Sequence, residues 1–146
     1  MALQQGIFVP RNPKKYKGNN IHQITFRSGW ELKVMTHFDV NPNVLEWSSE
    51  CVVVPYISPI DQRTHRYFPD FLAKLRKKDG SIKTYLYEVK PHAQTIEPQK
   101  KSRITKKYIN EVYTWGVNSS KWQAAMQYCD KMGWEFAILT EKDLFQ

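Results

Sequence analysis

Apolar residues recur every three or four positions in three stretches of the chain, and this spacing predicts three amphipathic helices. The first begins at Ser28, where Ser-Gly-Trp-Glu has the spacing of a capping box, and it ends before Pro42. The second is predicted over residues 102–115 and the third over residues 120–132, each closed by a glycine. One early helix and two late helices result.

Segments rich in β-branched and aromatic residues predict three strands over 44–56, 66–76 and 81–90, and a fourth over 135–140. A turn over residues 58–63 joins the first two strands. The first three strands are expected to form an antiparallel meander. If the last strand joins the sheet beside the third, the intervening helices form a right-handed crossover. The fold class is then α/β, a mixed central sheet flanked by helices.

The loop between the second and third strands decides which side chains share a face of the sheet. A two-residue turn, Asp79-Gly80, would place Asp70 on the side of Val89. A three-residue loop with Gly80 in the left-handed conformation sets Asp70 opposite Glu88 instead. We expect the three-residue loop, although a bulge elsewhere would restore the same face by another route.

Two acids and a lysine lie where these strands begin and end. Asp70 follows a proline at a strand start, while Glu88 and Lys90 end the next strand on one face. Two converging carboxylates bind Mg²⁺ as hard oxygen ligands, and the carbonyl of Val89 is a third candidate ligand. A neighbouring ammonium orients or activates water. The pattern predicts a metal-dependent phosphodiesterase centre.

Each of these residues also has a purely structural interpretation. Glu88 would pair with Lys90 or a neighbour in a salt-bridged sheet while Asp70 only initiates a strand, because Glu-x-Lys is a common string. Glu31 is a fourth candidate for the centre, because it lies on a half-buried helix face from which it would reach the metal directly or through water. Its alternative role is the capping box.

The chain carries 22 Lys and Arg against 14 Asp and Glu, a net charge of +8, so a polyanionic partner is plausible. The alternative is a soluble basic surface without a partner. Basic residues gather at 11–17, 74–78 and 100–107. The predicted DNA contacts are Arg11, Lys14, Lys15, Lys17, Lys106 and Lys107.

Residues 1–20 contain prolines and a basic run without periodicity, which predicts an extended N-terminal arm before a single domain over residues 21–146. The arm would lie along a phosphate backbone or remain a solvated tail.

No apolar run approaches the roughly 18 residues of a membrane span, and no secretory signal is evident, so we expect no membrane partner and a cytoplasmic location. Cys51 and Cys129 are expected to be small buried residues without a disulfide.

Four segments together resemble the PD-(D/E)xK nuclease superfamily, and within it the TnsA-like nucleases. This resemblance implies the restriction-endonuclease-like αβββαβ core and cleavage of DNA with Mg²⁺, for which Mn²⁺ substitutes. It assigns catalytic roles to Glu31, Asp70, Glu88 and Lys90. The segments are Phe26-Arg-Ser-Gly-Trp-Glu31, Tyr67-Phe-Pro-Asp-Phe71, Tyr87-Glu-Val-Lys-Pro91 and Gly133-Trp-Glu-Phe-Ala-Ile-Leu-Thr-Glu141.

Some superfamily members carry a Gln or Lys on the following helix, and Lys121 or Gln123 matches this position only loosely. With the arm Pro10-Arg-Asn-Pro-Lys-Lys-Tyr-Lys-Gly18 included, nearly the whole chain resembles the head-completion proteins of T-even-type tailed phages. That resemblance implies a double-stranded or branched DNA substrate, action on packaged DNA ends, and contacts with portal or head proteins. It places the protein in the infected cell and the virion head.

A non-enzymatic interpretation also remains, in which the chain is a DNA-binding virion connector that kept the nuclease fold. The intact acids and lysine disfavour it, because clustered carboxylates repel one another without a metal ion.

Overall fold

The centre of the molecule is a four-stranded mixed sheet, seen in the computed structural model, which describes residues 5–145. Neighbouring strands are antiparallel except for the last pair, which is parallel. This confirms the predicted meander and the joining of the last strand beside the third. In order across the sheet, the strands are β3 (Val44–Ser49), β6 (Phe71–Arg76), β7 (Ile82–Val89) and β8 (Glu135–Leu139).

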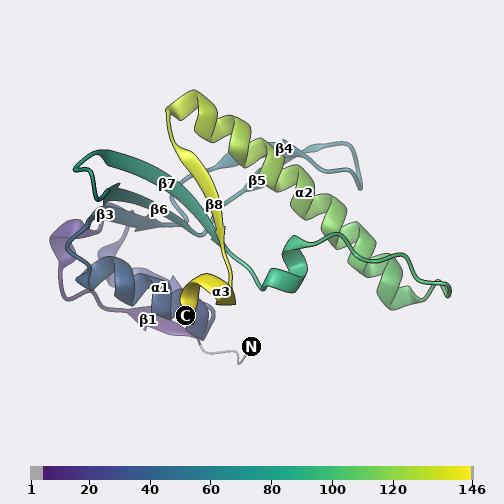
Figure 1. Ribbon diagram of the computed structural model, residues 1–146, viewed down its shortest axis with the longest axis horizontal. Helices are drawn as coiled ribbons and strands as arrows, with labels where there is room; N and C mark the ends of the chain where they lie inside the picture. Colours follow the sequence, from purple (N-terminus) through teal and green to yellow (C-terminus); the bar gives the residue numbers. More distant parts are fainter. Residues whose placement is uncertain (1–4, 146) are drawn as a thin grey trace.

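Helices cover both faces of this sheet, so the predicted sandwich is also confirmed (Figure 1). Helix α1 (Gly29–Val40) packs on one face, and α2 (Lys106–Met132) crosses the other. The short helix α3 (Glu141–Leu144) follows β8 and touches α1. Helix α1 begins and ends where the capping signals predict, with Ser28 as N-cap and Asn41 as C-cap.

The β6–β7 hairpin has the expected register. Phe71 pairs with Tyr87, and the Lys77 N–H donates to the Ser81 carbonyl at 2.7 Å, which leaves three loop residues between them. Gly80 within that loop has a φ of 86°, a conformation that glycine adopts without steric cost. The three-residue loop is therefore confirmed.

Two of the expected strands are each divided into two. The first ends at Ser49, because Glu50 turns the chain with a φ of 53°, and β4 (Val54–Ile57) then belongs to a separate hairpin with β5 (Thr64–Tyr67). The second is interrupted at Pro69, which has no N–H for a ladder. The predictions of single strands over 44–56 and 66–76 are therefore wrong.

The two helices expected after β7 are one continuous helix, α2. Gly116 does not end it, because glycine costs a helix interior only about 1 kcal/mol, which tertiary packing offsets. A side chain at Gly116 would lie 3.7 Å from the Pro59 ring, so this glycine lies where α2 passes the β4–β5 turn. The helix begins after its N-cap Thr105 and stops at Gly133, whose φ is 75°. A short 3₁₀ helix, η3 (His92–Thr95), precedes it.

The described part of the expected N-terminal arm is packed on the domain, whereas Met1–Gln4 lie outside the described residues. It contains β1 (Gly6–Phe8), which pairs with β2 (Ile24–Phe26), and the 3₁₀ helix η1 (Pro13–Lys15). A second 3₁₀ helix, η2 (Ile21–Gln23), follows it and leads into β2. The buried carboxylate of Asp39 accepts the Arg11 and Asn12 N–H groups at 2.8 and 2.9 Å. Residues 5–20 therefore do not form the extended arm that their composition suggested.

Two hydrophobic clusters hold the layers together. Trp47, Phe71 and Met35 lie at the centre of the cluster under α1, and Leu86 and Trp122 lie in the cluster under α2. Cys51 and Cys129 are both free; Cys129 is buried as expected, whereas Cys51 is only partly buried, so that part of the prediction is wrong. None of the helices within residues 5–145 is long and apolar enough to span a membrane.

Candidate active site

One cavity of about 250 Å³ brings together all four residues expected to be catalytic. Asp70 enters from the start of β6, Glu88 and Lys90 from the end of β7, and Glu31 from the first turn of α1. The hairpin register and the capping signal at Ser28 are the local features that bring them to one place. The cavity is lined by Ser28, Trp30, Glu31, Asp70, Glu88, Val89, Lys90, Pro91 and Gln94.

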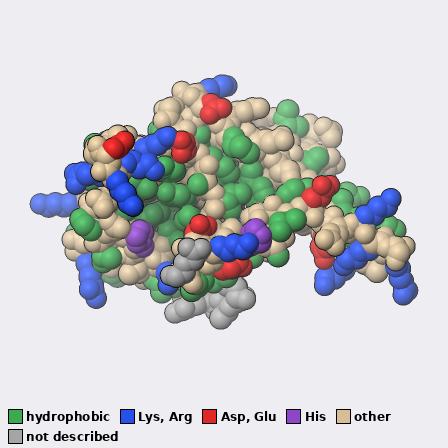
Figure 2. Space-filling model, in the orientation of Figure 1, with side chains coloured by type: hydrophobic (Ala, Val, Ile, Leu, Met, Phe, Trp, Pro, Cys, Tyr) green, Lys and Arg blue, Asp and Glu red, His purple; other side chains and the backbone are tan. Residues whose placement is uncertain are grey.

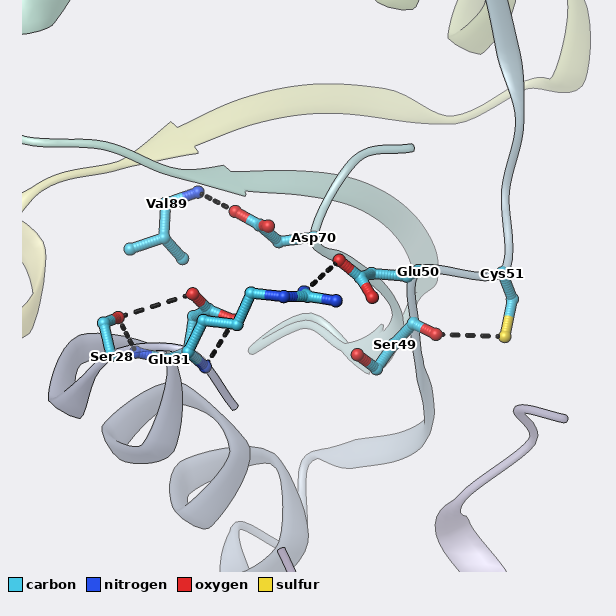
Figure 3. A network of polar contacts seen from close by, with 8 residues as sticks. Ser28, Glu31, Ser49, Glu50, Cys51, Asp70 and Val89 are labelled. Atoms are coloured by element: carbon cyan, nitrogen blue, oxygen red, sulfur yellow. Dashed lines mark hydrogen bonds and ion pairs between the residues drawn. The ribbon is translucent and has the colours of Figure 1, made fainter. Parts of the chain in front are cut away.

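Asp70 is fixed by the backbone of the neighbouring strand. Its Oδ2 accepts the Val89 N–H at 2.7 Å (Figure 3). Its carbonyl accepts the Glu50 N–H at 3.0 Å. Because Asp70 lies just before β6, its carboxylate is free to turn toward β7. The break in the expected strand at Pro69 therefore directs the Asp70 carboxylate toward the end of β7, where Glu88 lies.

Asp70 and Glu88 perturb each other. Burial raises the pKa of Asp70, and the charge of Glu88 raises it further. Burial also raises the pKa of Glu88, which is only 7% exposed, while a hydrogen-bonding interaction with Asp70 and then the ammonium of Lys90 oppose this shift. Two buried carboxylates of like charge resist joint ionisation unless a cation lies beside them.

Glu31 serves the start of α1 and also faces the cavity (Figure 3). The Ser28 hydroxyl accepts the Glu31 N–H at 3.2 Å, while the Glu31 carboxylate accepts the Arg27 N–H at a long 3.4 Å. Burial raises the pKa of Glu31, and the charge of Asp70 adds to that shift. Ser28 is therefore observed as the N-cap, whereas the Glu31 carboxylate binds the Arg27 N–H and the Ser28 hydroxyl and not the Ser28 N–H of a capping box. The metal role of Glu31 stays a prediction.

The donors at this site suit a hard divalent cation. Within residues 5–145, no cluster of three or more His, Cys, Asp or Glu side chains lies close enough to hold a metal ion. Asp70 and Glu88 are thus a two-carboxylate set, with the Val89 carbonyl as a candidate third donor. Mg²⁺ typically keeps several waters and uses one or two carboxylates plus substrate phosphate, so this set fits it.

Lys121 and Tyr67 lie near Glu88, although the sequence pattern indicated little or no role for them at this site. The Lys121 ammonium lies 5.5 Å from the centre of the Tyr67 ring, and its charge lowers the pKa of Glu88. The buried Tyr67 phenol has its pKa raised by burial and then by the charge of Glu88. Lys121 matched only a loose pattern, and no local pattern marks Tyr67. Gln123 is exposed and does not line the cavity.

The residues expected to contact DNA differ in exposure, because Lys15 is bound within the protein while the other five are exposed. The Lys15 ammonium donates to the carbonyls of Asp39 and Asn41 at 3.0 and 2.8 Å, so it binds the end of α1. Helix η1 and the start of α2 lie at opposite ends of the molecule (Figure 1). The five that are exposed are Arg11, Lys14, Lys17, Lys106 and Lys107.

The chain is similar in sequence to known nucleases over most of its length. The family described as TnsA-like endonuclease N terminal matches residues 41–141, a range that includes Asp70, Glu88 and Lys90 but not Glu31. The chain is also 39% identical over 143 residues to the Head completion nuclease of Enterobacteria phage T4, covering 95% of this chain and 92% of that protein.

Proposed function

This chain belongs to the TnsA-like endonuclease family, and on that premise we propose that it hydrolyses DNA phosphodiester bonds at the cavity containing Asp70, Glu88 and Lys90. The observation that carries the proposal is the convergence of a buried carboxylate, a partly buried carboxylate and a lysine from adjacent strands. A sheet that served only for stability would gain nothing from this pair, because each carboxylate raises the energy of the other.

Each residue has a separate task in the proposed mechanism. Asp70 and Glu88 would hold Mg²⁺ or Mn²⁺, the Val89 carbonyl would be a further ligand, and the Val89 N–H keeps the Asp70 carboxylate oriented. The bound cation would neutralise charge on the scissile phosphate. Lys90 orients the attacking water or stabilises charge that develops on the phosphate. Glu31, which lines the same cavity, would reach the cation directly or through a water molecule.

The biological setting is proposed from the T4 relative, whose name places it in head completion. We propose that this chain acts at the same stage on packaged DNA ends, inside the infected cell and at the virion head. Contacts with portal or head proteins belong to this proposal. The exposed residues Arg11, Lys14, Lys17, Lys106 and Lys107 would contact DNA phosphates.

A cleavage assay tests the proposal. Linear, nicked, flapped and branched DNA would be incubated with the purified chain and Mg²⁺, Mn²⁺ or a chelator. We expect cleavage of at least one form with either cation and none with the chelator. Tight DNA binding without cleavage under any condition would instead support the non-catalytic connector.

A further inference from the structure

A second, larger cavity begins beside the candidate active site. The first half of α2 and the segment at residues 93–99 enclose a groove of about 950 Å³. Gln94 lines both this groove and the cavity that contains Asp70 and Glu88, so the two spaces adjoin. The groove is therefore continuous with the place where the proposed function puts the scissile phosphate.

The groove combines apolar surface with side-chain amides. Ile96, Pro98 and Trp115 contribute flat or apolar surface, while Asn110 and Asn118 contribute amide groups. Asn118 is only 7% exposed, and it lines the groove. Nucleobases have apolar faces that stack on aromatic rings and polar edges that pair with amides. The lining thus has the chemistry that recognises unpaired bases.

Charge is distributed unevenly along the groove. Lys107 lines its outer end, and the projecting segment before it is strongly basic (Figure 2). Glu97 and Glu111 also line the groove, and they disfavour phosphates within it. A bound strand would accordingly keep its backbone toward the basic end and its bases inward. The exposed basic residues that lead to Lys107 are Lys100, Lys101, Arg103 and Lys106.

The groove is large enough for a single DNA strand but too small for a DNA duplex. Its volume lies at the upper end of small-ligand pockets, roughly 300–1,000 Å³, which admits a few nucleotides and no duplex. From Lys107 to Asn118 the helix rises about 17 Å, which a stacked strand at roughly 3.4 Å per nucleotide spans with about five nucleotides.

We propose that the groove binds an unpaired DNA strand next to the scissile phosphate, so that the enzyme prefers DNA with an overhang or flap over blunt duplex. This inference rests on the proposed nuclease function and names its substrate class. Trp115 and the adjoining apolar residues would contact the base faces, and Asn118 would hydrogen-bond a base edge.

Affinity measurements test the groove separately from cleavage. Fluorescence anisotropy would compare a blunt duplex with the same duplex carrying a five-nucleotide overhang, with Ca²⁺ replacing Mg²⁺ to suppress hydrolysis. We expect the overhang to bind at least about tenfold more tightly, the effect of about one stacked base. Thr114→Trp would fill the groove and abolish this preference, since Thr114 is an exposed lining residue.

The matched control is Tyr113→Trp, at a neighbouring exposed position that does not line the groove, and it should keep the preference. Circular dichroism would establish that both variants are folded. Equal binding of blunt and overhanging DNA by the wild-type chain would overturn the inference, as would an unchanged preference in folded Thr114→Trp. If Mg²⁺ supports duplex cleavage while the preference is absent, the groove inference fails alone. Absence of all cleavage would contradict the proposed function instead.

Discussion

Replacing Asp70 by asparagine is expected to stabilise the metal-free protein, although it removes a proposed metal ligand. The asparagine amide keeps an oxygen that accepts the Val89 N–H, so the geometry at the end of β7 is retained. What changes is the negative charge, which is buried beside Glu88. The variant therefore isolates the electrostatic cost of the carboxylate pair.

The sign and size of the effect follow from the raised pKa values of both acids. A carboxyl whose pKa is higher in the folded state binds more protons there, so stability falls as pH rises through that range. One pKa unit corresponds to about 1.4 kcal/mol. The rise of the Asp70 pKa from 3.8 to about 8 therefore sets an upper bound of about 6 kcal/mol. Relaxation of the protein and entry of water relieve most of such a burial penalty, and about 1 kcal/mol is subtracted for the weaker neutral hydrogen bond, so we expect a net gain of about 1–2 kcal/mol at pH 8. In a domain of this size that raises Tm by about 3–8 °C.

Thermal unfolding in a chelator at pH 5 and pH 8 would measure this difference. The gap between Asp70→Asn and the wild type should widen at pH 8, whereas Mg²⁺ should raise the wild-type Tm more than that of the variant. Asp130→Asn, at an exposed position on α2, controls for the change in net charge. A metal-free variant that is less stable than the wild type at pH 8 would refute the argument that the two carboxylates repel.

Three further outcomes are expected. Lys90→Ala should leave Mg²⁺ binding, measured by calorimetry, largely intact while lowering the cleavage rate by about 10²- to 10⁴-fold; an unchanged rate would assign Lys90 a structural role only. Glu31→Gln should slow cleavage with little change in Tm, and full activity would leave Glu31 as a capping residue alone. Combined alanine replacement of the exposed Arg11, Lys14 and Lys17 should reduce the slope of log Kd against log salt by up to about three, since each lost phosphate contact removes about 0.9; an unchanged slope would show that these side chains do not touch DNA. Deleting residues 1–17 would not test this, because β1 packs on the domain.

Local signals in the sequence were sufficient for much of the fold. Ser28 acts through a hydroxyl that caps its own helix, and Gly80 and Gly133 act through their own backbone conformation, so all three could be identified without tertiary information. Features that depend on contacts between distant residues could not be identified in this way. The continuation of α2 through Gly116 depends on packing that local stop signals do not reveal, and the N-terminal segment is held by Asp39, 27 and 28 residues away.

The candidate active site also has parts that could be predicted from local sequence and parts that depend on distant contacts. Asp70, Glu88 and Lys90 could be predicted together because strand alternation and hairpin register are short-range properties. The position of Lys121 over Tyr67 depends on how α2 crosses the sheet, and that placement is set by the whole α2-side core. The groove that contains Gln94 arises only when η3 lies against α2.

The most direct test of the central claim is the single-turnover rate of DNA cleavage in Mg²⁺ by Asp70→Asn and Glu88→Gln, compared with the exposed control Asp130→Asn. DNA affinity would be measured for each protein in Ca²⁺, so that loss of binding is separated from loss of chemistry. The account predicts near-complete loss of cleavage in the first two variants, with DNA still bound and the control at the wild-type rate. Cleavage at the wild-type rate by folded Asp70→Asn and Glu88→Gln would contradict it.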